Sequence, residues 1–114
     1  MQRWHTAIPV FLLFVAACSP STGNDWPPFV DQLIAELEAG PKKNPPGSIW
    51  KYNYNGLVVF YIPPSCCDVP GELYTSDGEP VCAPDGGITG AGDGRCPDFF
   101  GARTGELLVW ADSR

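Results

Sequence analysis

The feature that most constrains the fold is Asn55-Gly56, which stands between two runs rich in β-branched and aromatic residues. Both central residues of a two-residue type I′ turn need positive φ, and Asn-Gly tolerates this well. We therefore predict a β-hairpin over residues 48–63, with Tyr54 opposite Leu57. Six apolar or aromatic residues share one face of this hairpin: Trp50, Tyr52, Tyr54, Leu57, Val59 and Tyr61.

The two faces of the hairpin differ because side chains alternate between the faces of a strand. The first face, described above, carries only apolar and aromatic side chains, so we expect it to pack against a helix. The second face is mixed, and we expect it to be partly solvated. It consists of Ile49, Lys51, Asn53, Val58, Phe60 and Ile62.

A helix is predicted over residues 27–39. Pro27 and Pro28 stand at its start, where a missing N–H costs nothing. Asp25 is a candidate cap, and Gly40, which is followed by proline, marks the end of the helix. The expected fold is therefore α+β, with one N-terminal helix packed on a small antiparallel sheet. The apolar stripe of the helix consists of Phe29, Val30, Leu33, Ile34 and Leu37.

A second, shorter hairpin is predicted over residues 73–83, turning at Asp77-Gly78. In this register Tyr74 would face Val81 and Leu73 would face Cys82. Pro80 cannot donate a hydrogen bond to a sheet, so we expect it on an edge strand. Two further elements are predicted nearer the C-terminus: a helical turn over residues 97–102 and a strand over residues 106–111.

Residues 1–17 have the features of an export signal. Arg3 supplies positive charge, an apolar stretch follows, and Ala16-Ala17 are small residues before Cys18. An uncleaved transmembrane anchor is disfavoured because the apolar stretch, of about ten residues, is half the ~20 that a span requires. The remaining alternative is an ordinary secretory signal. The pattern resembles the lipobox of bacterial lipoproteins, in which the cysteine thiol is acylated before cleavage.

This resemblance predicts a lipoprotein signal peptide over residues 1–17, a lipidated tether over residues 18–25 and a single α+β domain over residues 26–114. Bacterial lipoproteins carry two or three acyl chains, palmitate among them, and more than one chain makes an anchor durable. Ser19 follows Cys18, where aspartate is the usual inner-membrane retention signal. The expected location is thus the bacterial cell envelope, at the periplasmic face of the outer membrane or the cell surface.

Four cysteines follow the predicted tether: Cys66, Cys67, Cys82 and Cys96. An even number in a small exported domain predicts two disulfides. Zinc is disfavoured because there are no Cys-x2-Cys pairs and the single histidine, His5, lies in the signal. A bond between adjacent cysteines would be strained. The preferred pairing is nested, Cys67 with Cys82 and Cys66 with Cys96.

The glycine-rich segment, residues 84–100, is the candidate site. It lacks the Gly-Lys-Ser/Thr and Gly-x-Gly-x-x-Gly spacings of nucleotide-binding loops. The favoured interpretation is an Ω-like loop held by Cys96, whose aspartates accept hydrogen bonds from its own backbone. A calcium site is the second interpretation, and a ligand or partner surface is the third. The candidate calcium ligands are Asp85, Asp93 and Asp98, with Asp68 as a fourth.

Three stretches, residues 64–68, 73–74 and 82–94, together resemble an uncharacterised family, a domain of unknown function found in small bacterial lipoproteins. Its core is Cys-Cys-Asp, followed by Gly-Gly-Ile-Thr-Gly-x-Gly-Asp-Gly and Pro-Asp-Phe. The resemblance spans about Trp26 to Asp112. It supports the lipoprotein prediction and implies no catalytic residue.

The charge and the residue types narrow the function. A net charge of −6 disfavours nucleic acid as a partner. An enzyme is not expected, because without a histidine after the signal the usual Ser-His and Cys-His pairs are missing. We expect a small binding module whose partner is an envelope protein or ligand, with no cofactor unless calcium binds. A protease-inhibitor-like module using residues 63–71 is an alternative, and a carboxylate-based hydrolase is the least favoured.

Overall fold

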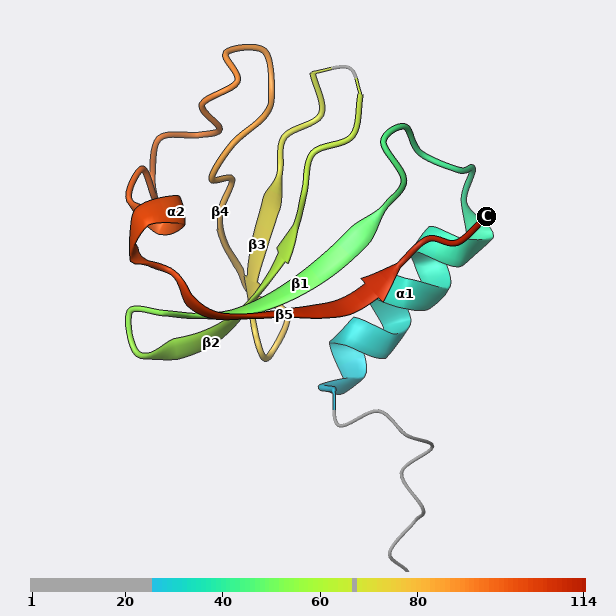
Figure 1. Ribbon diagram of the computed structural model, residues 1–114, viewed down its shortest axis with the longest axis horizontal. Helices are drawn as coiled ribbons and strands as arrows, with labels where there is room; N and C mark the ends of the chain where they lie inside the picture. The colour runs from blue at the N-terminus through green and yellow to red at the C-terminus, as the bar shows by residue number, and fades with distance from the viewer. Residues whose placement is uncertain (1–25, 67) are drawn as a thin grey trace, which may run out of the picture.

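The computed structural model describes residues 26–66 and 68–114. It is an α+β structure, as predicted, with a helix and a five-stranded antiparallel sheet (Figure 1). The signal, Cys18, the candidate cap Asp25 and Cys67 lie outside the described residues. Among those described, no helix is long and apolar enough to cross a membrane. The elements are α1 (Pro28–Ala39), β1 (Ser48–Tyr54), β2 (Leu57–Ile62), β3 (Glu72–Thr75), β4 (Pro80–Cys82), α2 (Phe99–Ala102) and β5 (Thr104–Ala111).

The β1–β2 hairpin has the predicted turn and register. Asn55 and Gly56 both have positive φ, 50° and 76°, as a type I′ turn requires. Tyr54 pairs with Leu57, and Trp50 pairs with Tyr61. The turn therefore sets which side chains share a face along the whole hairpin.

The sheet has the order β4-β3-β2-β1-β5, so β4 and β5 are its edges. Pro80 lies on β4, which confirms the predicted edge position. The predicted pairing of Leu73 with Cys82 is confirmed, but Tyr74 pairs with Pro80 rather than with Val81. A register shift between Leu73 and Tyr74 accounts for the difference, because an irregularity of this kind displaces one strand against the other.

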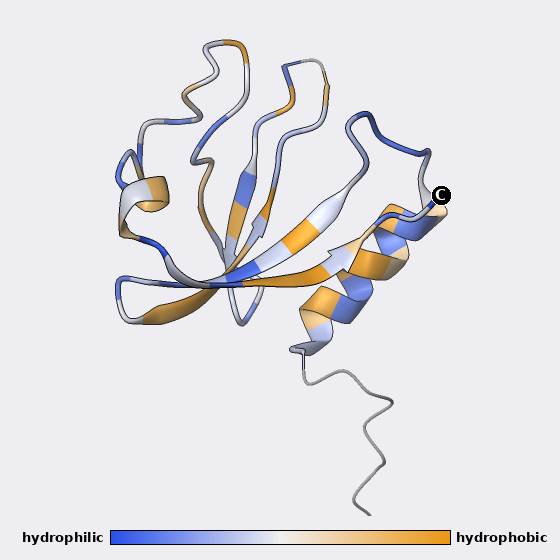
Figure 2. Cartoon of the chain, in the orientation of Figure 1, coloured by the Kyte–Doolittle hydropathy of each residue, from blue (hydrophilic) through white to orange (hydrophobic). Residues whose placement is uncertain are grey.

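The expectation that α1 packs on the aromatic first face of the hairpin is wrong. Helix α1 packs on the second face, where Val30 is fully buried with Ile49 and Phe60. The Phe29 and Phe60 rings meet edge to face, with their centroids 5.6 Å apart. Figure 2 shows hydrophobic and hydrophilic residues alternating along α1, as an amphipathic helix requires.

The distribution of polar groups explains this choice of face. On the second face the polar residues Lys51 and Asn53 both belong to β1, whereas β2 contributes only apolar side chains, against which α1 packs. The first face carries tyrosines, and a buried hydroxyl needs an acceptor that the apolar stripe of α1 does not have. Residues 83–103 cover that face instead and bring carboxylates to it.

Candidate functional site

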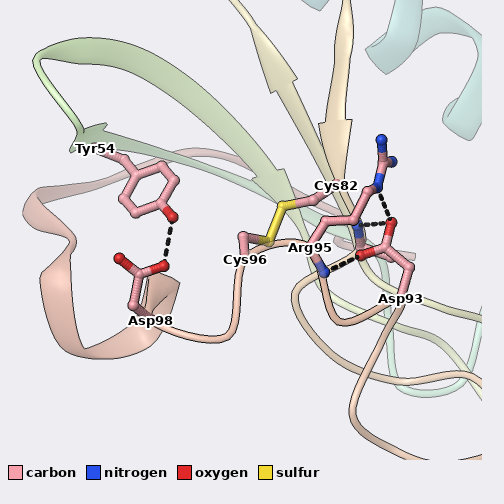
Figure 3. The surroundings of a disulfide bond; sticks show 7 residues. Tyr54, Cys82, Asp93, Arg95, Cys96 and Asp98 are labelled. Carbon is pink, nitrogen blue, oxygen red and sulfur yellow. Dashed lines mark hydrogen bonds and ion pairs between the residues drawn. A yellow bond between two sulfur atoms is a disulfide. The ribbon is translucent and has the colours of Figure 1, made fainter.

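The glycine-rich segment is closed by a disulfide between Cys82, at the end of β4, and Cys96 (Figure 3). The two Cα atoms are 6.2 Å apart. A bond that closes a loop of this length contributes about 3 kcal/mol in the chain-entropy model. The bond fixes the segment against the aromatic first face of the sheet, because both cysteines are buried in the core there.

The predicted nested pairing of these cysteines is therefore wrong. Cys82 and Cys96 bond to each other, because the segment folds back over the aromatic first face, where Cys82 is buried. Cys66 is also disulfide-bonded, and Cys67 lies outside the described residues. The spacing of the cysteines along the chain did not predict that Cys82 and Cys96 lie side by side in the fold.

Asp93 closes the base of the segment. Its carboxylate accepts hydrogen bonds from the backbone N–H groups of Ala83, at 3.1 Å, and Arg95, at 3.0 Å. The Arg95 guanidinium is 2.8 Å from the same carboxylate (Figure 3). The Arg95 backbone and side-chain bonds hold the pKa of Asp93 below its usual value. Asp93 thus has the self-bonded role that the Ω-loop interpretation predicts.

Three tyrosines of the first face each donate a hydrogen bond to a different carboxylate. Tyr61 donates to Asp85 at 2.6 Å, and Tyr54 donates to Asp98 at 2.7 Å. Tyr52 donates to Glu106 at 2.7 Å, and burial together with this bond raises the pKa of Tyr52 to about 12. These roles were not predicted from the sequence, although tyrosines on a buried face are a signal that acceptors must lie nearby.

The four candidate calcium ligands have separate positions. Asp85, Asp93 and Asp98 each bind a different partner, and Asp68 lies in the neighbouring loop with a φ of 70°. Among residues 26–66 and 68–114, no three His, Cys, Asp or Glu side chains are grouped so that they could hold a metal ion. Asp85 and Asp98 attach the segment to tyrosines of the sheet, whereas Asp93 accepts its hydrogen bonds from Ala83 and Arg95 at the base of the segment.

Phe99 anchors the end of the glycine-rich segment. It is fully buried, and its ring centroid lies 5.2–5.6 Å from those of Tyr52, Tyr54 and Tyr61. Arg103 follows α2 and stacks on the Tyr52 ring, with its guanidinium carbon 4.8 Å from the ring centroid. The segment is therefore fixed at both ends, by the disulfide at Cys82 and by this aromatic cluster.

The glycine-rich segment and the loop over residues 63–71 are joined. The Gly71 N–H donates to the Asp85 carbonyl at 2.9 Å, and Pro70 forms a β-bridge with Gly86. Gly86 has a φ of 74°, and a Cβ there would lie 2.8 Å from the backbone carbonyl oxygen of Val69. Only glycine allows the two backbones to come this close.

The two joined loops project from one end of the sheet (Figure 1). Each exposes a large apolar side chain: Ile88 is 90% exposed and Val69 is 43% exposed. We call these residues together the loop-tip surface. Single exposed apolar side chains are common on protein surfaces. These two are candidate contact residues because they lie on loops that a disulfide and backbone hydrogen bonds hold in place.

A family model described as a domain of unknown function (DUF6970) matches residues 35–112. The matched region contains the end of α1, all five strands and α2, and therefore both joined loops. No curated protein and no solved structure matches the chain.

Proposed function

The chain belongs to the DUF6970 family. From its loops and from the lipobox-like segment before Cys18, we propose that it is a lipid-anchored binding module of the bacterial cell envelope. In this proposal the loop-tip surface, Ile88 and Val69, contacts an envelope protein. The exposure of Ile88 on a loop that is fixed to the sheet is the observation that carries the proposal.

The way the loops are held supports a binding role. The Cys82–Cys96 disulfide and the Tyr61–Asp85 hydrogen bond fix the glycine-rich segment before any partner arrives. A loop that is already ordered loses little conformational freedom on binding, so more of the contact energy is available for affinity. A large apolar side chain at such a position is well suited to fill a pocket on another protein.

The start of α1 lies on a side of the domain that suits a lipid anchor on Cys18. Helix α1 begins at the end of the molecule opposite the joined loops (Figure 1). With Cys18 lipidated, the domain would be attached to the bilayer on the side where α1 begins. The loop-tip surface would then face away from the membrane, where an envelope protein can reach it.

We expect a photo-crosslinking residue at position 88 to trap a discrete partner in cells of the native host. The matched control is position 57, because Leu57 is also exposed, at 58%, but lies at the β1–β2 turn, away from the joined loops. Ile88→Ser should weaken capture of the trapped partner about tenfold, as for a binding hot spot. Equal crosslinking at both positions, or none at position 88, would contradict the proposal.

The anchor is tested separately by detergent phase separation. The wild-type chain should enter the detergent phase and Cys18→Ser the aqueous phase, because acyl chains supply the membrane affinity. If the wild-type chain stays in the aqueous phase with the variant, the chain has no lipid anchor.

Calcium binding at Asp85, Asp93 and Asp98 is the less favoured alternative. Each of these carboxylates already accepts a hydrogen bond from a different donor, and calcium requires six to eight oxygens around one point. Binding would therefore need the segment to release the sheet, which the disulfide and Phe99 oppose.

A further inference from the structure

We propose that the groove between α1 and the β3–β4 turn binds a lysine or arginine side chain of a partner protein. The groove has a volume of about 260 Å³ and is separate from the loop-tip surface. Ligand pockets for whole small molecules usually have volumes of roughly 300–1,000 Å³. The size of this groove therefore suits a single long side chain. It is lined by Phe29, Gln32, Leu33, Glu36, Tyr74, Asp77 and Gly78.

Two aromatic rings form the apolar part of the groove. The centroids of Phe29 and Tyr74 are 5.9 Å apart, and the rings are tilted by 55°. The backbone at Gly78 lies directly against Phe29: a Cβ there would be 3.1 Å from Phe29 Cγ, and the φ is 83°. The turn thus fixes the Phe29 ring, and the faces of such rings attract cations.

Carboxylates supply the charge of the groove. Glu36 lies on the α1 side and Asp77 on the turn side, and both side chains are exposed. No Lys, Arg or His of the described residues lines the groove. Burial and the neighbouring Glu72, which lies outside the groove lining, raise the pKa of Tyr74, and Glu36 of the groove raises it further. The groove therefore combines aromatic rings with negative charge, which is complementary to a cation on an apolar stem.

The occupant is a side chain of a protein rather than a free amine. Cation–π contacts and ion pairs at an exposed rim are individually weak, so they do not hold a small amine at low concentration. A lysine or arginine that belongs to a partner protein does not need strong contacts of its own, because the rest of the interface holds it in the groove. The groove would then select partners that place a basic residue at this point.

The test is a titration of the full chain, in detergent micelles, with an acetylated tetra-arginine peptide. NMR spectra of the protein are recorded at each peptide concentration. We expect amide shifts at Phe29, Tyr74 and Gly78, with saturation at millimolar peptide. The peptide in which citrulline replaces arginine has the same shape without the charge, and it should cause no shifts at these residues. Equal shifts with the citrulline peptide, or none with arginine, would overturn the proposal.

Charge variants distinguish peptide binding in the groove from nonspecific attraction of the peptide to an acidic protein. The double variant Glu36→Gln/Asp77→Asn should weaken binding about tenfold. The control Asp31→Asn/Glu79→Gln removes the same charge from α1 and the same turn, outside the groove lining. An equal loss in the control would show nonspecific attraction and contradict a site. Ile88→Ser should leave peptide binding unchanged, so this result and that of the loop-tip proposal are independent.

Discussion

Replacing Phe99 with alanine is expected to lower the free energy of unfolding by about 3–5 kcal/mol. Phe99 is fully buried, and its ring contacts three tyrosine rings of the sheet. Removing it leaves a cavity at the point where the end of the glycine-rich segment is attached. The disulfide and Asp93 would still hold the other end, so the segment should remain partly ordered.

The matched control is the neighbouring Phe100→Ala. Phe100 is 42% exposed and packs edge to face on Tyr61 and Phe99, so its truncation should destabilise the protein by about 1–2 kcal/mol, less than that of Phe99. Chemical denaturation of the full chain in detergent, with the denaturant slope compared between variants, measures both changes. Similar midpoints for the two variants would show that Phe99 is not the anchor of the segment.

Gly92→Ala is expected to cost at least about 3 kcal/mol of stability, because the position has no room for a side chain and an unfavourable φ. A Cβ at residue 92 would overlap the Ala83 carbonyl oxygen and lie 2.8 Å from the Asp85 nitrogen. The φ of Gly92 is 68°, in the left-handed region. The same Ala83 carbonyl accepts a hydrogen bond from the Asp93 N–H, so moving it also disrupts the base of the segment.

Gly90→Ala separates the steric effect from the backbone effect. Gly90 belongs to the same segment and has a φ of 79°, but a Cβ there would meet nothing within 4 Å. Gly90→Ala should therefore lower the free energy of unfolding only by the strain of a left-handed alanine, about 1–2 kcal/mol. Thermal unfolding of both variants compares them directly, and equal losses would mean that the close approach at Ala83 does not limit the fold.

The sequence by itself determined the local structure, because short-range chemistry sets it. Asn55-Gly56 accepts positive φ at both positions, so the turn and the register of β1 and β2 followed from two residues. Pro80 lacks an N–H, so its place on an edge strand was predictable. The helix over residues 27–39 was predicted to within one residue of α1, since prolines begin it and Gly40 ends it.

The candidate site was only partly predictable from the sequence. Glycines and aspartates marked residues 84–100 as a special loop, and the role of Asp93 followed from its neighbours in the chain. The partners of Asp85 and Asp98 are tyrosines 24 and 44 residues away, and no local pattern identifies them. The groove beside α1 and the loop-tip surface likewise depend on segments that come together only in the folded chain.

Only the tertiary structure decided which face of the hairpin α1 covers and which cysteines pair. Both faces of the hairpin could bury apolar area, so hydrophobicity alone did not choose between them. The choice depended on the tyrosine hydroxyls, whose carboxylate acceptors are brought by residues 83–106. Once that stretch covers the tyrosine face, Cys96 lies beside Cys82, and α1 packs on the opposite face. Satisfying buried polar groups between distant segments is a property of the whole chain, and it decided the arrangement that local patterns left open.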